Sequence, residues 1–561
     1  MKKITSLFLS LVLLLNIALT CQISALAATV SGTCGKNVSW SLNLDTGKMT
    51  VSGKGEIENK SLEWPWESYK DRITAIDIND GITDIGCYAF QSCKSLKEVS
   101  LPNTLKTLSY NVFYYCKSLK EVSLPDSLVS MGHYCFAETG IESVTLPRNM
   151  DCSINESFSC FADCFKLKSI NVAEGNPNLI SIDGVLFYQQ YYDSYLDTVL
   201  ALMFYPHAKS GESYSVPDNV AYVAKYAFDG NRRLKKVDAS SYKYTLSLGE
   251  SAFKDCTNLS NFSVGDRVCL FGASAFENCV SLKTIDTEGL FGISEATFRN
   301  CESLKSITIR KFDEIPESAF SGCTSLTDVN YLGTEEEWKK VSVEEGNDEL
   351  LSAKMHFGTL DSSPDNFRYV ERDDGTLYVT DYVGNGTEIV IPSEINGKKV
   401  TGCAFYGIES NGDNYAGILS VTIPATVTDI DEKAFRFFTS LDEFIVDENN
   451  QDFKSVEGCL LSKDGTALIS VPAAYYESYY LAIGEVKYVE NYALFNCRYA
   501  RYLWVDEGIK FGGTDIVGKN SGIIKIFGYS GTELQVNAVK CGIPYVTLDE
   551  YDYKKQSNGF D

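Results

Sequence analysis

The stretch Ile82–Pro147 repeats one pattern three times: ITDIGCYAFQSCKSLKEVSLP (residues 82–102), LKTLSYNVFYYCKSLKEVSLP (105–125) and LVSMGHYCFAETGIESVTLP (128–147). With phenylalanine as the register mark, Phe90, Phe113 and Phe136 lie 23 residues apart. Each is followed at a fixed distance by a Φ-x-x-Φ-x-Φ-Pro run, in which Φ is apolar. A constant period of this length predicts a solenoid of stacked coils.

One copy shows why the copies come in series. In KSLKEVSLP, the apolar residues Leu96, Val99 and Leu101 end in an alternation that predicts a short strand, which Pro102 terminates. A single copy has too few apolar side chains for a core, so neighbours above and below must stabilise it. We therefore expect successive strands to form a parallel sheet along one side of the coil.

The Ala-Phe-x-x-Cys-x-x-Leu core, as in Ala89–Leu96, followed by the Φ-x-x-Φ-x-Φ-Pro strand, resembles the leucine-rich repeat of bacterial BspA-type surface proteins. The resemblance covers nearly the whole chain after its N-terminal segment. It implies a leucine-rich repeat solenoid of the α/β type, with short parallel strands and irregular or short helical return segments. It also implies attachment to host or neighbouring-cell proteins, or to glycans, with no cofactor.

The N-terminal segment is typical of a signal peptide. Lys2 and Lys3 precede an apolar run from Leu7 to Leu19, and Ala25-Leu26-Ala27 fits a cleavage site, so we expect residues 1–28 to be removed and the protein to be exported. We expect no lipid at Cys21, because Ala18-Leu19-Thr20 is a poor approach to a lipidated cysteine. No later run is long enough to span a membrane.

The charge of the chain excludes one class of partner. After removal of the signal peptide, 48 basic residues face 75 acidic ones, a net charge of about −27. This charge argues against nucleic acid or an anionic membrane surface as the partner. It also keeps a long exposed array soluble, and 44% apolar residues are ample for a core.

The 18 cysteines suggest disulfides in an exported protein, but their positions argue otherwise. Eight of them stand three residues after the register residue, one per coil: Cys93, Cys116, Cys164, Cys256, Cys279, Cys301, Cys323 and Cys497. We interpret them as a column of buried thiols that bond weakly to the backbone. Neighbouring coils are close enough for pairing, and the odd number left after cleavage requires at least one free thiol.

The repeat pattern divides the chain into two arrays with hairpin and helix caps. The expected parts are a cap hairpin at 29–72, a first array at 73–332, a helical end cap at 333–358, a linker at 359–366, a second cap hairpin at 367–403, a second array at 404–525, a terminal cap at 526–548 and a flexible tail at 549–561. Trp64 and Trp66 are expected in the core of the first cap. Capping boxes are predicted at Thr334 with Glu337 and at Thr532 with Gln535, and Gly542 fits a left-handed helix stop.

Two insertions interrupt the arrays, at 173–215 and 447–482. In the first, 184–187 and 198–205 are predicted to pair as a projecting hairpin, and 458–461 and 467–471 mirror it in the second. Insertions of this kind map to exposed loops, and tyrosine supplies contact area with a polar tip. The candidate ligand contacts are therefore Tyr188, Tyr191, Tyr192, Tyr195, Tyr475, Tyr476, Tyr479 and Tyr480. The alternative is that these tyrosines pack the insertions onto the coils.

A second candidate surface follows the strands of the first array. The residues between the last two apolar positions of each strand are small and polar: Ser100, Ser123, Thr145, Asn171, Asp238, Ser263, Asp286, Thr308 and Asn330. They are expected to form a flat, exposed ladder, and solenoids commonly bind ligands on such a face. Small polar residues also suit a solvated strand to which nothing binds.

The sequence contains no pattern that favours catalysis. The three histidines, His133, His207 and His356, stand in different settings, and no pair has metal-ligand spacing. There is no nucleophile elbow, phosphate loop or dinucleotide fingerprint. We expect a monomeric, non-catalytic binding or adhesion protein, secreted or held at the cell wall, without a metal. The alternatives are a carbohydrate-binding accessory protein of a secreted polysaccharide-degrading system and a structural component of the cell surface.

Overall fold

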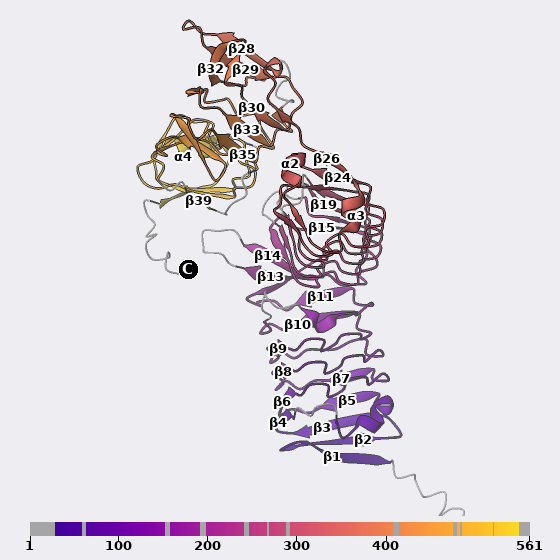
Figure 1. Cartoon of the computed structure of the whole chain (residues 1–561). Helices are drawn as coiled ribbons and strands as arrows, with labels where there is room; N and C mark the ends of the chain where they lie inside the picture. The colour runs from indigo at the N-terminus through magenta and orange to yellow at the C-terminus, as the bar shows by residue number, and fades with distance from the viewer. Residues whose placement is uncertain are drawn as a thin grey trace, which may run out of the picture. The chain divides into compact units, whose positions relative to one another are not determined.

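The fold is a solenoid of short parallel strands with little helix (Figure 1). The computed structural model describes residues 28–58, 63–151, 158–190, 198–240, 246–265, 269–287, 292–407, 415–474, 480–482, 485–519 and 521–548. The predicted signal peptide, except for residue 28, lies outside these ranges, as does the predicted tail. The predicted leucine-rich repeat solenoid is therefore confirmed for the described residues.

The described chain forms two compact units that share neighbouring stretches of sequence. The first unit comprises Met1–Glu212, Val223–Arg233 and Ser251–Cys256, and the second comprises Ser213–Tyr222, Leu234–Glu250 and Thr257–Asp561. The predicted linker at 359–366 falls within the second unit, so the two-array division stays a prediction.

The first unit begins with an antiparallel cap that changes into parallel coils. Its first sheet contains β1 (Thr29–Gly35), β2 (Val38–Asn43), β3 (Lys48–Gly53), β5 (Ala75–Ile78) and β7 (Glu98–Ser100). Strands β1, β2 and β3 pair antiparallel, and β3 starts the parallel ladder with β5. The predicted hairpin is thus confirmed, and η1 (Glu67–Arg72) links the cap to the first coil.

Several coils also carry a second strand, which the sequence pattern did not predict. In the first unit these strands are β4 (Gly55–Ile57), β6 (Ile82–Ile85), β8 (Thr107–Leu108) and β9 (Ser130–Met131). The first unit continues with β10 (Ser143–Leu146), η2 (Ser159–Phe161), β11 (Ser169–Val172), β12 (Leu179–Ile182), β13 (Val185–Gln190) and β14 (Val199–Phe204). β16 (Val220–Val223) lies where the sequence ranges of the two units meet.

The turn that holds the register phenylalanine has a left-handed residue on each side. Around Phe90 these are Tyr88 (φ 62°) and Ser92 (φ 61°), and around Phe113 they are Asn111 (φ 55°) and Tyr115 (φ 63°). This geometry turns alternate backbone N–H groups along the coil axis, so the N–H of Phe90 donates to the carbonyl of the next coil at 2.9 Å. The turns are therefore hydrogen-bonded from coil to coil, as the strands are.

The register rings stack into a buried column. In the first unit Trp66 lies between Trp64 and Phe90, with ring centroids 5.1 and 5.4 Å apart, and Phe113 follows 5.5 Å from Phe90. Trp64 and Trp66 are 2% and 0% exposed, so their predicted place in the cap core is confirmed. In the second unit Phe298 lies between Phe276 and Phe320 at 5.7 and 5.4 Å.

The cysteine column is buried and bonds to the backbone, as predicted. The structure gives all sixteen described cysteines as thiols, and fourteen of them are buried. The thiol of Cys116 donates to the carbonyl of Phe90 at 3.2 Å, and that of Cys164 donates to Phe136 at 3.1 Å. The second unit repeats this contact between Cys301 and Phe276 at 3.2 Å. Burial raises the pKa of the Cys116 thiol to about 12, so it stays protonated as a donor.

The second unit continues the coils with two sets of strands. One set comprises β15 (Ser213–Ser215), β17 (Lys236–Asp238), β19 (Asn261–Gly265), β21 (Thr284–Thr287), β22 (Ser306–Ile309), β24 (Asp328–Tyr331) and β26 (Lys354–Phe357). The other comprises β18 (Leu246–Leu248), β20 (Cys269–Phe271), β23 (Glu314–Ile315) and β25 (Ser342–Val343). Two short helices, α2 (Glu335–Trp338) and α3 (Asp348–Ser352), follow β24. The capping box predicted at Thr334 and Glu337 is formed at α2.

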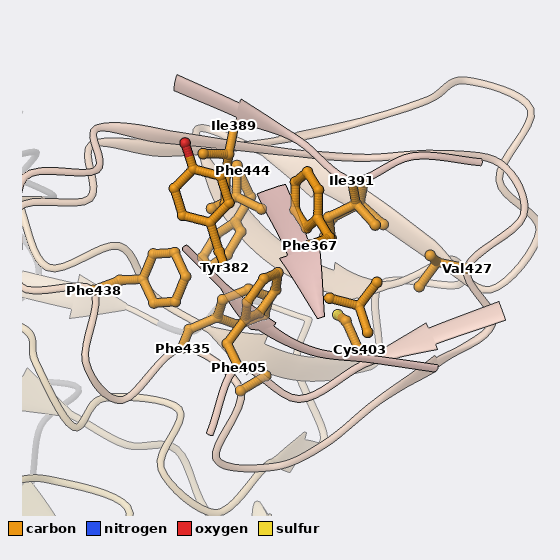
Figure 2. Packing of buried hydrophobic residues seen from close by; sticks show 14 of the residues in the cluster. Phe367, Tyr382, Ile389, Ile391, Cys403, Phe405, Val427, Phe435, Phe438 and Phe444 are labelled. Atoms are coloured by element: carbon orange, nitrogen blue, oxygen red, sulfur yellow. The ribbon is translucent and has the colours of Figure 1, made fainter. Parts of the chain in front are cut away.

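The next part of the second unit has its own apolar core (Figure 2). Its elements are β27 (Leu360–Asp361), η3 (Pro364–Asn366), β28 (Phe367–Glu371), β29 (Leu377–Tyr382), β30 (Glu388–Val390), β31 (Glu394–Ile395), β32 (Lys398–Cys403), β33 (Ser420–Ile423), β34 (Asp429–Ile430) and β35 (Glu443–Val446). β28 and β29 pair antiparallel, which confirms the second predicted hairpin. Figure 2 shows Phe367, Tyr382, Phe405 and Phe435 pointing into one interior.

The chain then forms the last coils and a terminal helix. Its elements are β36 (Phe453–Val456), β37 (Cys459–Ser462), β38 (Ala467–Ser470), β39 (Tyr480–Ala482), β40 (Tyr488–Val489), β41 (Tyr502–Trp504), β42 (Lys510–Phe511), β43 (Lys525–Gly528), α4 (Glu533–Cys541) and β44 (Tyr545–Thr547). The left-handed stop at Gly542 (φ 72°) is confirmed. The predicted capping box is half correct: Thr532 accepts from the N–H of Gln535, but Gln535 accepts from Gly531 instead of Thr532.

Candidate functional site

The tyrosines predicted in the insertions fall largely outside the described residues. Tyr191, Tyr192, Tyr195, Tyr475, Tyr476 and Tyr479 all lie outside the described ranges. Tyr188 is half-buried in β13, and Tyr480 belongs to β39, beside β41. Their role in binding stays a prediction.

The first insertion differs from the projecting hairpin that we expected. β13 and β14 do pair antiparallel, but all six residues of β14 are buried. Tyr205 directly follows and stacks on Phe228 with ring centroids 4.9 Å apart. Tyr205 is thus a register residue, 23 positions before Phe228, and this spacing was a signal in the sequence. The prediction of a hairpin that projects as a whole was wrong because its second strand supplies core to a coil.

The polar ladder is partly exposed. The side chains of Ser100, Ser123, Thr145, Asn171 and Asn330 are exposed, and those of Asp238 and Thr308 are half-buried. Ser263, by contrast, is 7% exposed, because the register between β19 and β21 shifts after it and moves its side chain out of line. Asp286 lies in register beside Ser263, and its side chain is not among those that the structure describes.

A cluster of aromatic residues, two of them exposed, lies instead on the return turn of the first unit. Tyr110 is 51% exposed and stacks on His133 of the next coil, with ring centroids 5.7 Å apart and planes at 10°. Tyr134, 45% exposed, contacts His133 at 6.4 Å. The N–H of Tyr88 donates to the carbonyl of Tyr110, and that of Asn111 donates to His133. We call these five residues, Tyr88, Tyr110, Asn111, His133 and Tyr134, the tyrosine turn.

The backbone of the tyrosine turn explains why sequence reasoning missed it. Tyr88 and Tyr134 occupy the left-handed position before the register phenylalanine, at φ 62° and 56°. At the same position other coils have the short residues Asn111, Ser251 and Ser274, which suit the left-handed conformation better, and also Tyr226 and Tyr492. A bulky residue held there costs about 1–2 kcal/mol, and such strain concentrates at functional sites. The sequence showed these tyrosines but not the turn that directs them outward.

A second group of charged residues in the first unit surrounds His207. Burial lowers the pKa of His207 to about 4, and its Nε2 donates to the carbonyl of Asp229 at 2.9 Å. Burial, together with the charges of Asp255 and Asp163, raises the pKa of Asp229 to about 7. These two shifted pKa values make the stability of the coil depend on pH.

Buried charges in the second unit neutralise one another. Lys311 lies 3.0 Å from Glu337 and 3.1 Å from Glu388, and Arg310 pairs with Asp442. Burial opposes the charge on Lys311, but the two carboxylates outweigh it and raise its pKa. Because each cation has carboxylate partners, we assign this group a structural role and not a binding role.

The remaining histidines make structural contacts. The Nδ1 of His133 lies 2.7 Å from the hydroxyl of Ser159, and the Nε2 of His356 lies 2.9 Å from Asp328. Among the residues that the structure describes, no group of three or more acidic, histidine or cysteine side chains could hold a metal ion. No helix in the described part is both long and apolar enough to cross a membrane.

Comparison with solved structures finds other leucine-rich repeat proteins. A leucine-rich repeat protein from Eubacterium ventriosum is 19% identical, with 62% of this chain and 99% of that chain covered and a TM-score of 0.46. A leucine rich cell surface protein from Faecalibacterium prausnitzii is 24% identical, with 56% and 98% covered and a TM-score of 0.37. The pneumococcal vaccine antigen PcpA is 18% identical, with 75% and 99% covered and a TM-score of 0.35.

A search of curated proteins found no match. The family model for the BspA type leucine rich repeat region matches in six copies, over residues 68–192, 202–327 and 407–462, which is more than half of the chain. The matched ranges include the tyrosine turn and most of the coils described above. This chain therefore belongs to the BspA-type leucine-rich repeat family.

Proposed function

We propose that this chain is a non-catalytic binding or adhesion protein that acts outside a bacterial cell and recognises an extracellular protein or glycan. The N-terminal segment supports export, and the family supports a repeat scaffold at the cell surface. The single observation that carries the proposal is the tyrosine turn. It presents two exposed tyrosines from neighbouring coils, Tyr110 and Tyr134, the second at a left-handed position that suits a short residue better.

Tyrosine is well suited to such a role. It buries a large area on binding, loses little side-chain entropy and has a hydroxyl for hydrogen bonding. The left-handed backbone of Tyr134 and the stacking of Tyr110 on His133 are formed without any ligand, so the ligand would meet rings already held in place. Preorganisation of this kind lowers the entropic cost of binding.

The proposal is tested by binding of residues 29–561 to an array of extracellular-matrix proteins and of mucin, plant and bacterial glycans. Three proteins are compared: the natural sequence, the Tyr110→Ala/Tyr134→Ala variant, and a Tyr191→Ser/Tyr192→Ser/Tyr195→Ser variant for the insertion. We expect saturable binding at micromolar concentrations that the first variant loses. Loss only in the second variant would move the site to the insertion, and absence of any saturable ligand would contradict the proposed function.

The second candidate function is that of a carbohydrate-binding accessory protein in a secreted polysaccharide-degrading system. The contact between Tyr110, His133 and Tyr134 favours it, because neighbouring aromatic rings are what a glycan site needs. Glycan binding with no protein ligand on the same array would support it. A structural role at the cell surface would be supported if nothing binds.

A further inference from the structure

We propose that the tyrosine turn binds a neutral saccharide chain that runs along the coil axis, one sugar for each coil. This inference rests on the proposed function and names the chemical class of its ligand. Four observations carry it: the low charge of the turn, the spacing of the coils, the unused hydrogen-bonding groups and the restriction of the cluster to three coils.

The first observation is the low charge. The eight residues from five before to two after each register phenylalanine, at 85–92, 108–115 and 131–138, contain one charged side chain, Glu138, which forms an ion pair with Lys117 and accepts from the hydroxyl of Tyr114. The same eight residues of a later coil of the first unit, 223–230, carry Lys225 and Asp229. A turn surface with little charge on a strongly acidic protein favours a neutral ligand over a charged peptide or polymer.

The second observation is the spacing. The rings of Tyr110 and His133, on successive coils, are 5.7 Å apart, and the buried column beneath them advances by 5.5 Å and then 5.2 Å per coil. The repeat distance per pyranose unit in an extended β-linked chain is close to this advance per coil. A saccharide lying along the axis would therefore meet equivalent side chains at each successive sugar.

The third observation concerns hydrogen-bonding groups. The phenol hydroxyls of Tyr88, Tyr110 and Tyr134 and the side-chain amide of Asn111 form no hydrogen bond with any other described residue. They offer both donors and acceptors at an exposed aromatic surface. Sugars combine hydroxyls with apolar C–H faces, so the same surface can satisfy both parts of the ligand.

The fourth observation is that the cluster has a limited length. Tyr88, Tyr110 and Tyr134 belong to three consecutive coils, marked by Phe90, Phe113 and Phe136. In the next coil the position before Phe161 is the buried Ser159. The site therefore has room for three sugars, and a longer chain gains no further contacts.

The test is calorimetric titration of residues 29–561 with neutral gluco-, xylo- and manno-oligosaccharides, from disaccharide to hexasaccharide. We expect the affinity for one series to rise up to the trisaccharide and then stay constant. Tyr110→Ala/Tyr134→Ala should weaken binding about tenfold or more, as expected for the loss of two aromatic contacts. Tyr110→Phe/Tyr134→Phe keeps the rings and should weaken it less.

The matched control is Tyr226→Ala. Tyr226 occupies the same turn position, two residues before Phe228, with φ 60° and 36% exposure, but charged residues surround it. This variant should bind like the natural protein. Circular dichroism of every variant checks that the coils are folded, and the phenylalanine variant gives a readout even if the alanine variant is unstable.

Three results would overturn the inference. They are affinity that does not depend on chain length, affinity retained in Tyr110→Ala/Tyr134→Ala, and preference for an acidic polysaccharide such as polygalacturonate. Failure of all saccharides together with saturable binding of a protein on the array would refute this inference and leave the proposed function standing. Failure of both would refute the proposed function as well.

Discussion

The two insertions use the same scaffold but differ where each rejoins the coils. Near the start of each insertion lies an asparagine whose side-chain amide donates two hydrogen bonds and accepts two. Asn450 donates to the carbonyls of Pro424 and Val427 at 2.8 and 2.9 Å, and accepts from the N–H groups of residues 452 and 453 at 2.9 and 2.8 Å. Asn176 makes the equivalent four bonds at 3.2, 2.8, 3.0 and 2.8 Å.

The similarity continues through the hairpins. β12 and β13 are joined by Asp183-Gly184 at φ 50° and 76°, and β36 and β37 by Glu457-Gly458 at φ 50° and 77°. In the first insertion, the N–H of Ala208 donates to the carbonyl of Leu167 at 2.7 Å as the chain rejoins the coil. In the second, Ala474 donates to the carbonyl of Leu441 at 2.8 Å.

The difference lies just before these alanines. The first insertion has Tyr205-Pro206-His207, and the second has Val471-Pro472-Ala473. The backbone N–H of Tyr205 donates to the carbonyl of Ala227 in the following coil, and that of Val471 donates to Ala493, each at 2.8 Å. The scaffold is thus set by the asparagine and the turn, whereas the residue after the proline is free to vary.

The largest effect is expected from removal of the asparagines. Asn450→Ala leaves buried backbone groups without partners and should lower the free energy of unfolding of its coil by about 3 kcal/mol. Asn176→Ala should cost about 1–2 kcal/mol, because Asn176 is only half-buried whereas Asn450 is 0% exposed. Hydrogen exchange of the N–H groups of residues 452–453 and 178–179 measures each site separately. Equal protection in variant and natural protein would show that the amide does not hold the scaffold.

The next effect depends on pH and is confined to the first insertion. His207 has a pKa near 4 in the folded state, so it gives stability that is complete above its unfolded pKa of about 6.5 and lost as the pH falls towards 4. Asp229, with its pKa raised to about 7, binds a proton more tightly when folded, so its contribution is lost as the pH rises from about 4 to 7. The two changes of stability with pH therefore oppose each other between about pH 4 and 7.

Single variants should therefore reveal each slope. His207→Ala, which copies Ala473, should make the first unit lose stability as the pH rises from 4 to 7, by about 1–3 kcal/mol. Asp229→Asn should produce the opposite slope. Thermal melting at several pH values measures both, and Ala473→His in the second insertion is the reciprocal test. If the stability of the two single variants changed with pH in the same direction, the proposed opposite contributions of His207 and Asp229 would be wrong.

These regions also show what the sequence could and could not predict. The short apolar runs at Val185–Phe187 and at Leu460–Leu461 were enough to place the hairpin strands, because an apolar run bounded by turn residues is a local signal. β12 and β36 were missed because their pairing depends on a two-residue turn with a non-glycine residue at positive φ. The tyrosine turn was missed for the same reason: the outward position of Tyr134 follows from its left-handed backbone, which residue type does not reveal.

The smallest effect should come from the hairpin turns themselves. Both central positions of this turn need positive φ, which asparagine and aspartate tolerate better than glutamate. Glu457→Asn should therefore stabilise the second hairpin by about 0.5–1 kcal/mol, whereas Asp183→Asn should change the first hairpin very little. Urea unfolding followed by hydrogen exchange in β37 and β13 measures the two changes. If both substitutions give the same gain, the difference between glutamate and aspartate at φ 50° does not distinguish the turns, and the stability of the hairpins must come from the asparagine clamp alone.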